Sequence, residues 1–294
     1  MGFINVFAGA ECNIRVNKDQ LILKDGVSYP IEDLGCVVID NLRTAVSVYA
    51  LNALSKAGVS VIICDETHLP YSVLLPQSGY YRRLDTLKAQ STLSKPAQKQ
   101  LWQRIVKRKI LNQAECLGYF GIDGADKLTA LAAKVTSNDS GNKEAESARI
   151  YFRALFGESF TRKSDNEINS ALNYGYAIVR ATVARELCAR GFECAYGLFH
   201  CNKYNAYNLA DDLMEPFRPV VDAVVYRYIE MEGASFDKRK IFTVLDVDVN
   251  IKSGSYTLAA AAEISAESLL NCYRENSSDI LLPSFAGVCR HDYE

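Results

Sequence analysis

Three separate segments of this sequence carry side chains that could hold a divalent cation together. In NLADDLMEPFRPVVD, Asp212 and Glu215 are three residues apart, so a helix would place both carboxylates on one face. Glu144 in NKEAESARIYF and His200 in GLFHCNKYN add a carboxylate and an imidazole. If carboxylates converge to about 4 Å, each pair costs about 4 kcal/mol at an effective dielectric constant of about 20, and a cation would remove that cost. Two carboxylates and one imidazole suit Mg²⁺ or Mn²⁺.

Each of these residues also has an explanation without a cation. Glu144 falls in the first turn of an expected helix, where a carboxylate interacts favourably with the helix dipole by about 0.3–1 kcal/mol. A single histidine such as His200 is more often structural or exposed than a ligand. Asp212 could cap its own helix, and Arg218 could form an ion pair with Glu215. Spacing alone therefore does not show that the three segments meet.

The elements that would position these side chains differ between the two halves of the chain. Up to about residue 78, short apolar runs alternate with turn signals, which is typical of β-strands. The expected strands are Phe3–Phe7, Cys12–Val16, Leu21–Leu23, Val27–Ile31, Cys36–Ile39 and 59–65. Before the last of these, the apolar spacing in TAVSVYALNALSKAG predicts one helix, with Thr44 as its N-cap and Gly58 after its C-terminus.

Beyond about residue 84 the apolar spacing changes to the helical period. The expected helices cover residues 97–117, 124–135, 143–156, 166–190, 208–232 and 255–275. IFTVLDV at 241–247 is the main segment that could instead be a strand. The sequence therefore predicts an α+β fold with a small N-terminal β-rich domain at residues 1–78, a linker at 79–90 and a larger all-helical catalytic domain at 91–294.

The composition is that of an ordinary globular protein. The chain has 294 residues, of which 49% are hydrophobic, and a formal net charge of −2, which excludes a uniformly polycationic binder. No apolar run is long enough for a membrane span, and the N-terminus lacks the features of a signal peptide. The nine cysteines are odd in number and include no C-x-x-C pair, so we expect reduced thiols, no zinc ribbon and a cytoplasmic location.

Positive charge is concentrated in one segment, residues 82–109. It holds nine basic residues and one acidic residue, whereas the rest of the chain is acidic. Clustered lysine and arginine side chains bind nucleic acid by neutralising phosphates, although a solvated helix face has the same composition. The candidate DNA-binding residues are Arg82, Arg83, Lys99, Arg104, Lys107, Arg108 and Lys109.

These motifs, in this order, resemble the CRISPR-associated protein 1 family, the integrases that insert new spacers into CRISPR arrays. CDETHLP at 64–70 is similar to the family's β domain, and EAESARIYF at 144–152 to its first metal-ligand motif. GLFH at 197–200 resembles the family's histidine motif, and DDLMEPFRPVVD at 211–222 its acidic motif. The EPFRP form and the chain length are most similar to members from type II systems.

The resemblance implies roles for individual residues. The family's metal ligands, which are also its catalytic residues, fall on Glu144, His200 and Glu215, with Mg²⁺ or Mn²⁺ as cofactor. Asp212, Tyr174 and Asn173 match positions near the site and would support the ligands. The implied reaction is attack by the 3′-hydroxyl of a short DNA duplex on a phosphodiester of the CRISPR repeat, with the cation stabilising the developing charge.

The resemblance also implies partners. They are double-stranded DNA (the incoming spacer DNA and the leader–repeat), a second copy of the chain that dimerises through the β domain, CRISPR-associated protein 2 in a heterohexamer, and other adaptation proteins of type II systems; no membrane is expected. Two alternatives use the same sequence features. The first is a metal-dependent nuclease acting on branched DNA, and the second is an architectural DNA-binding subunit without chemistry.

Overall fold

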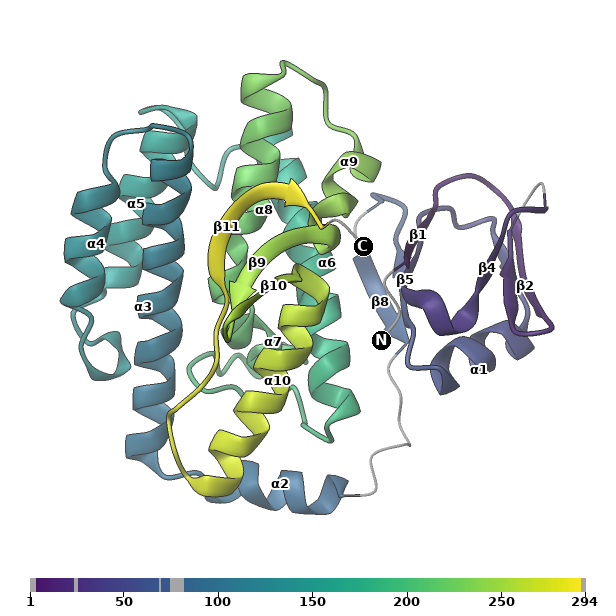
Figure 1. Ribbon diagram of the computed structural model, residues 1–294, viewed down its shortest axis with the longest axis horizontal. Coiled ribbons are helices and arrows are strands. Elements are labelled where there is room, and N and C mark those ends of the chain that lie inside the picture. The colour runs from purple at the N-terminus through teal and green to yellow at the C-terminus, as the bar shows by residue number, and fades with distance from the viewer. Residues whose placement is uncertain (1–3, 24–25, 69, 75–81, 292–294) are drawn as a thin grey trace.

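The N-terminal half is built from two sheets, on the right of Figure 1. The computed structural model describes residues 4–23, 26–68, 70–74 and 82–291. Within these residues, one sheet has the order β1(Ile4–Ala8), β5(Leu34–Ile39), β7(Ser60–Cys64), β8(Pro70–Leu74), with only β8 antiparallel to its neighbour. The other has the order β4(Ser28–Pro30), β3(Gln20–Ile22), β2(Asn13–Asn17), β6(Ala45–Val46). The expected β-rich N-terminal region is confirmed.

Strand β5 is buried on both faces. Val37 and Ile39 belong to the core of the N-terminal half, whereas Cys36 and Val38 belong to the large core of the C-terminal half. Successive side chains of a strand point to opposite faces, so two buried faces give an unbroken apolar run such as LGCVVI. On that side of the sheet, helix α6(Glu167–Ala189) contacts the neighbouring strands β7 and β8. The central sheet therefore connects the two halves.

The helix of the N-terminal half, α1(Val48–Lys56), begins later than expected. Ser47 is its N-cap, because the Ser47 hydroxyl accepts a hydrogen bond of 3.1 Å from the backbone N–H of Ala50. Thr44 instead precedes the short strand β6, so its assignment as the cap was wrong. Gly58, with φ of +73°, follows the helix as expected.

The C-terminal half is helical but not all-helical, which corrects the predicted fold class. Its helices include α2(Arg83–Thr92), α3(Lys95–Tyr119), α4(Ala125–Ala133), α5(Lys143–Phe156), α6 and α10(Leu258–Glu275). In front of them in Figure 1 lies a sheet with the order β10(Gly254–Thr257), β9(Val247–Ile251), β11(Ser284–Arg290). The fold is therefore mixed in both halves.

Two further segments differ from the prediction. The expected helix at 208–232 is divided into α7(Asn208–Leu213), a 3₁₀ turn η4(Glu215–Phe217), α8(Arg218–Val225) and a π-helical segment η5(Tyr226–Met231). Pro216 and Pro219 lie in the first turns of η4 and α8, where a missing N–H is tolerated. The segment at 241–247 is not a strand: it contains the end of α9(Lys238–Phe242) and the turn η6(Thr243–Asp246) before β9 begins.

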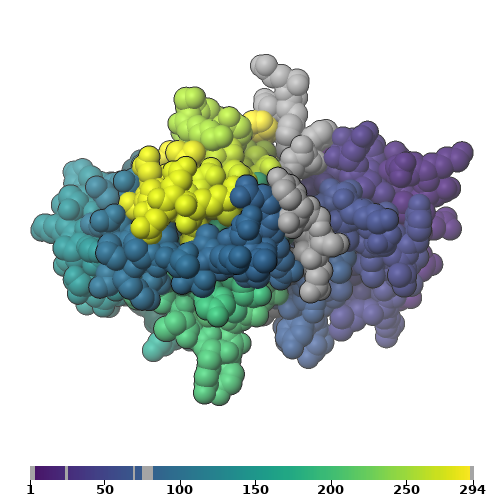
Figure 2. Space-filling model, turned by 90° about the horizontal axis from the view of Figure 1, so that it is seen from below, coloured from purple at the N-terminus to yellow at the C-terminus, as the bar shows by residue number. Residues whose placement is uncertain are grey.

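Helices α2 and α3, the blue band in Figure 2, form much of the lower surface of the C-terminal half. The expected boundary at residues 78 and 79 and one residue, 69, of the family-like stretch at 64–70 lie outside the described residues. No helix in the described ranges is long and apolar enough to cross a membrane. All nine cysteines are free thiols, and five of them are buried, as expected for reduced cysteines.

Candidate functional site

One face of α3 contacts every segment that carries a predicted metal ligand. This face carries Gln98, Trp102, Lys109 and Asn112. Successive members are four, seven and three residues apart, and these spacings place all of them on one side of the helix. The first two contact the segment around His200, and the third contacts both Glu144 and Glu215. Helix α3 thus brings together residues that are up to 71 positions apart in the chain.

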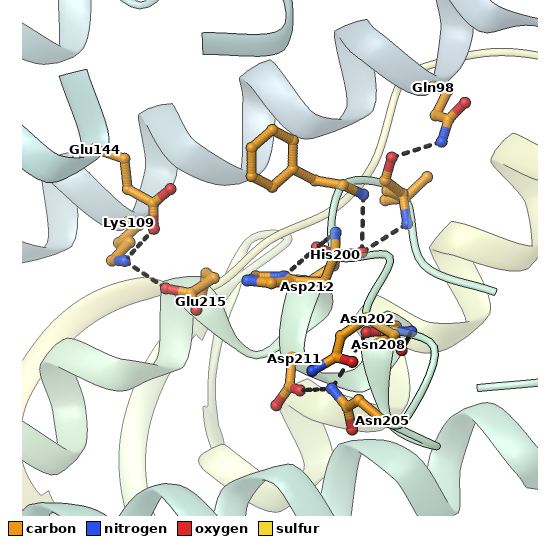
Figure 3. A network of polar contacts seen from close by, with 12 residues as sticks. Gln98, Lys109, Glu144, His200, Asn202, Asn205, Asn208, Asp211, Asp212 and Glu215 are labelled. Carbon is orange, nitrogen blue, oxygen red and sulfur yellow. Dashed lines mark hydrogen bonds and ion pairs between the residues drawn. The ribbon is translucent and has the colours of Figure 1, made fainter. Parts of the chain in front are cut away.

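Asp212 fixes the segment that carries His200. Its buried carboxylate accepts backbone hydrogen bonds from Leu198 (2.6 Å), Phe199 (3.1 Å) and His200 (3.1 Å), and the His200 Nδ1 lies 2.7 Å from Oδ1. Because an ionised carboxylate can only accept, Nδ1 carries a proton, and in the neutral imidazole Nε2 therefore keeps its lone pair. Figure 3 shows the imidazole extending from Asp212 toward Glu215.

Helix α3 supports the same segment from the other side. Trp102 is fully buried and stacks on Phe199, with the ring centroids 4.5 Å apart and the planes 2° from parallel. The His200 ring meets Trp102 edge-on at 5.9 Å, and Gln98 Nε2 donates to the Leu198 carbonyl at 2.5 Å. These contacts hold the backbone of residues 198–200 in one place, so the direction of the imidazole is set by packing as well as by Asp212.

Glu144 is presented by the N-terminus of α5. Both oxygens of the Asp139 carboxylate accept hydrogen bonds of 2.9 Å from the backbone N–H groups of Lys143 and Glu144, which caps the helix. Because Asp139 accepts the hydrogen bonds of these backbone N–H groups, the Glu144 carboxylate is not needed as a cap and extends to Lys109, whose Nζ lies 2.6 Å from Oε1. Glu144 therefore does more than interact with the helix dipole.

Glu215 is buried at the start of η4 and is held by two cations. Arg218 Nε donates to Oε1 at 2.8 Å, and Lys109 Nζ lies 2.5 Å from Oε2. The Arg218 guanidinium also stacks over the ring of Tyr176 at 4.5 Å. The predicted ion pair of Arg218 with Glu215 is present. Lys109 also bridges Glu215 to Glu144, as Figure 3 shows.

The local charges change the protonation of these groups. Burial alone would raise the pKa of Glu215, but the charges of Arg218 and Lys109 outweigh it and lower this pKa to about 2. Burial would lower the pKa of Lys109, but the carboxylates of Glu215 and Glu144 raise it. The hydrogen bond with Asp212 raises the pKa of His200. Glu215 is thus an anion at neutral pH.

The donors at this site fit a divalent cation in type. The Oε2 atom of Glu215 is buried and contacts the Lys109 ammonium, a position that a metal cation would suit equally, and Nε2 of a neutral His200 keeps a lone pair because Nδ1 is held by Asp212. Across the part of the chain that the structure describes, however, no three histidine, cysteine, aspartate or glutamate side chains are close enough together to hold a metal ion. The structure brings Glu144 and Glu215 together around Lys109 and keeps His200 outside that contact.

The other two predicted supporting residues contact side chains outside the predicted ligand set. Tyr174 is fully buried in α6, its ring meets Phe236 edge-on at 6.0 Å, and its hydroxyl has no hydrogen-bond partner. Asn173 accepts a hydrogen bond of 2.7 Å from Arg162. The contacts of both residues are thus made with side chains other than Glu144, His200 and Glu215.

The predicted DNA-binding residues fall into different environments. Lys99 and Lys107 are exposed on α3, and neither forms an ion pair with a described residue. Arg82, Arg104 and Arg108 pair with nearby carboxylates, and Arg83 begins α2. Lys109 differs from all of them because it is buried between the two glutamates. The exposed members are available to phosphates, whereas Lys109 is engaged inside the site.

Sequence reasoning missed four residues that position the site. Gln98 and Trp102 hold the His200 segment, Asp139 caps α5, and Lys109 bridges the glutamates. A signal for three of them was present, because Gln98, Trp102 and Lys109 recur at helical spacing on one face of α3. Nothing in the spacing shows which distant segments that face contacts.

Comparisons with known proteins agree with the family-like motifs. A family model described as CRISPR associated protein Cas1 matches residues 7–250. The CRISPR-associated endonuclease Cas1 of Neisseria meningitidis serogroup C (strain 8013) is 39% identical over 283 residues, which cover 93% of each chain.

Solved structures with a similar fold are more distant in sequence. A casposase bound to integration product is similar with a TM-score of 0.76 at 19% identity, over 95% of this chain and 92% of that one. A chain of a partial Cas6-RT-Cas1–Cas2 complex is similar with a TM-score of 0.62 at 19% identity, over 95% and 97%. At these identities the similarity is one of fold.

Proposed function

The chain belongs to the Cas1 family of CRISPR-associated endonucleases, and from this membership we propose that it is a divalent-metal-dependent DNA integrase of spacer acquisition. It joins the 3′-hydroxyl ends of short duplex DNA to the CRISPR repeat by transesterification. The observation that carries the proposal is that Glu144 and Glu215, from separate elements, meet at one buried positive charge beside the ordered His200 segment.

The residues that would hold Mg²⁺ or Mn²⁺ are Glu144, Glu215 and His200, through its Nε2 atom. When bound, the cation supplies Lewis-acid polarisation of the phosphoryl oxygen and neutralises the charge that develops on it. Both carboxylates are already directed to one point, and Asp212 keeps the imidazole in the tautomer that leaves Nε2 unprotonated.

The reaction needs no energy source. The 3′-oxygen of the incoming duplex forms a new phosphodiester as the bond within the repeat breaks, so one phosphodiester replaces another and a 3′-hydroxyl is released. The task of this chain is therefore positioning and charge stabilisation. Exposed cations of α2 and α3, such as Lys99 and Lys107, would hold the DNA phosphates.

The proposed partners follow from the family and from the fold. Two ends of one duplex must be joined at separate positions, which requires more than one active site. We therefore expect a homodimer through the β domain and a heterohexamer with CRISPR-associated protein 2, together with other type II adaptation proteins. The fold is shared with a chain of a Cas6-RT-Cas1–Cas2 complex, which supports a Cas2 partner.

A strand-transfer assay tests the proposal. Protein and its Cas2 partner are mixed with a labelled short duplex and a supercoiled plasmid that carries a leader and repeat, with Mn²⁺ or with EDTA. Glu144→Ala removes one proposed ligand, and Glu146→Ala, on another face of the same helix, is the matched control. Label should enter the plasmid only with Mn²⁺ and should be lost in Glu144→Ala alone.

Two other outcomes would contradict the proposal, and each would favour a different function. Metal-dependent cutting of branched DNA without joining would indicate a nuclease. Duplex binding without any chemistry, unchanged by Glu144→Ala, would indicate an architectural DNA-binding subunit.

A further inference from the structure

The ammonium of Lys109 lies where the two glutamates converge. Its Nζ atom is 2.6 Å from Glu144 Oε1 and 2.5 Å from Glu215 Oε2. Glu144 belongs to α5 and Glu215 to η4, and these two residues are 71 positions apart in the sequence, whereas Lys109 comes from α3. A single positive charge thus links three elements at the point where a cation would be held.

Lys109 is unlike the other lysines of its helix. It is only 8% exposed, although Lys99 and Lys107 of the same helix extend into solvent. A lysine is almost never buried unless its charge is paired, because its desolvation must be offset by nearby anions. The burial of Lys109 therefore depends on Glu144 and Glu215, and these carboxylates depend on Lys109 in turn.

The charges of the site balance without a metal ion. Two carboxylates, Glu144 and Glu215, face two cations, Lys109 and Arg218. A divalent cation added to this group would leave an excess of two positive charges in a largely buried place. One of the protein cations must then move, or an anion must arrive with the metal.

Lys109 is the cation that can move. Arg218 is held by Glu215 Oε1 at 2.8 Å and by stacking on Tyr176, and it does not touch Oε2. Lys109 has a flexible four-carbon side chain. Its ammonium contacts Glu144 Oε1 and Glu215 Oε2, which are the oxygens that would coordinate a metal ion. The Glu144 side chain, at the outer end of this bridge, is 24% exposed, so a displaced ammonium would reach solvent, where a DNA phosphate can meet it.

We propose that Lys109 is an internal competitor for the divalent cation, and that a DNA phosphate, by accepting the displaced ammonium, couples metal binding to DNA binding. The inference rests on the proposed metal site. In the free protein Lys109 neutralises Glu144 and Glu215 and keeps metal affinity low. When DNA is bound, the phosphate gives the ammonium a new partner, and both carboxylates become available to the metal.

Titration calorimetry with Mn²⁺ on the EDTA-treated full chain tests the competition. Lys109→Met removes the competing charge, and Lys127→Met, at an exposed position of α4, is the matched control for loss of one positive charge. Lys109→Met should bind Mn²⁺ at least tenfold more tightly than the wild type in the absence of DNA, and Lys127→Met should bind as the wild type does. Equal affinities for Lys109→Met and the wild type would overturn the inference and leave the metal site itself intact.

The same titrations with a 3′-dideoxy-terminated duplex, which cannot react, test the coupling. The duplex should increase the Mn²⁺ affinity of the wild type at least tenfold and that of Lys109→Met by clearly less. Equal increases would contradict the role of Lys109. Failure of both proteins to bind Mn²⁺, with or without the duplex, would overturn both this inference and the proposed metal-dependent function.

The wild-type protein provides a measurement that does not depend on a variant folding. Acetylation of individual lysines by sulfo-NHS-acetate can be followed by peptide mass spectrometry with and without Mn²⁺. Displacement predicts that Lys109 is slow to react in the free protein and reacts at least threefold faster with Mn²⁺, while Lys99 is unchanged. No change at Lys109, under conditions in which Mn²⁺ raises the melting temperature, would contradict displacement.

Discussion

Replacing Asp212 by asparagine tests how the structure orients His200. Asp212 accepts three backbone hydrogen bonds and one from His200 Nδ1, two at each oxygen. Asparagine has one oxygen and one NH₂ group, so the NH₂ must face two donors in either orientation. If it replaces Oδ2, the bonds from Leu198 and Phe199 are lost. If it replaces Oδ1, only the His200 backbone bond is lost, provided that the imidazole changes tautomer and accepts at Nδ1.

The second orientation is cheaper, and its cost can be estimated. A hydrogen bond to a charged acceptor contributes about 1.5–3 kcal/mol, so Asp212→Asn should lower the free energy of unfolding by about 2–3 kcal/mol. The changed tautomer has its proton on Nε2, which then has no lone pair for a metal. Loss of a partner of this kind typically reduces metal affinity or activity by about 10–100-fold.

Urea unfolding and Mn²⁺ titration measure the two effects separately. Asp211→Asn is the control, because Asp211 accepts from Asn205 and does not touch the His200 segment. We expect the control to retain Mn²⁺ affinity. Wild-type Mn²⁺ affinity and wild-type strand transfer in Asp212→Asn would refute the argument that Asp212 sets the tautomer, whatever the change in stability.

Three further predictions concern packing, pH and salt. A methyl group at Gly197 would lie 2.2 Å from the carbonyl oxygen of His200, so Gly197→Ala should lower the free energy of unfolding by about 1–3 kcal/mol and impair strand transfer; wild-type urea unfolding would contradict this. Burial raises the pKa of Asp222 from 3.8 to about 6, so the folded protein holds this proton more tightly than the unfolded chain, and wild-type stability falls as pH rises through that interval. The free energy of unfolding of Asp222→Asn should therefore rise by about 3 kcal/mol relative to that of the wild type between pH 4 and pH 7. If urea titrations gave the same difference between the two proteins at both pH values, the raised pKa of Asp222 would be contradicted. Lys99→Gln and Lys107→Gln should each reduce the slope of log DNA affinity against log salt concentration by about 0.9 in anisotropy titrations, and an unchanged slope would exclude a phosphate contact.

The sequence predicted the elements with strong local signals. The helix at 143–156 and the six expected strands of the N-terminal half appear close to the expected positions, because their turn and cap residues act within a few positions. Strands β6 and β8 were not expected. The expected helix at 208–232 was wrong in its continuity, because the chain there is divided into four segments and the prolines at 216 and 219 lie where two of them begin.

The C-terminal sheet was missed, and one of its two pairings is long-range, whereas β9 and β10 form a local hairpin that lies within and beside segments read as helical or ambiguous. Strands β9 and β11 are separated by helix α10, and Ser284 pairs with Asn250 across that helix. The segment at 241–247 had an ambiguous pattern. Its buried residues Ile241, Phe242, Val244 and Leu245 fall at helical spacing, and this spacing matches the observed helical turns better than a strand.

The residue types at the candidate site could be read from the sequence, but their arrangement could not. Glu144, His200 and Glu215 were selected on type, spacing and resemblance. Lys109 was grouped with surface cations because its neighbours Lys107 and Arg108 are basic. Only the packing of α3 against α5 and η4 shows that its charge faces inward.

The central claim is that Glu144, Glu215 and His200 form one cation site, and anomalous diffraction tests it most directly. Crystals of the protein bound to a 3′-dideoxy-terminated duplex would be grown with Mn²⁺, and data would be collected at the manganese edge. The account predicts an anomalous peak in contact with both carboxylates and with Nε2 of His200. A peak elsewhere would contradict it. A peak at the carboxylates would also contradict it if His200 contacted the metal through Nδ1 or did not contact the metal at all.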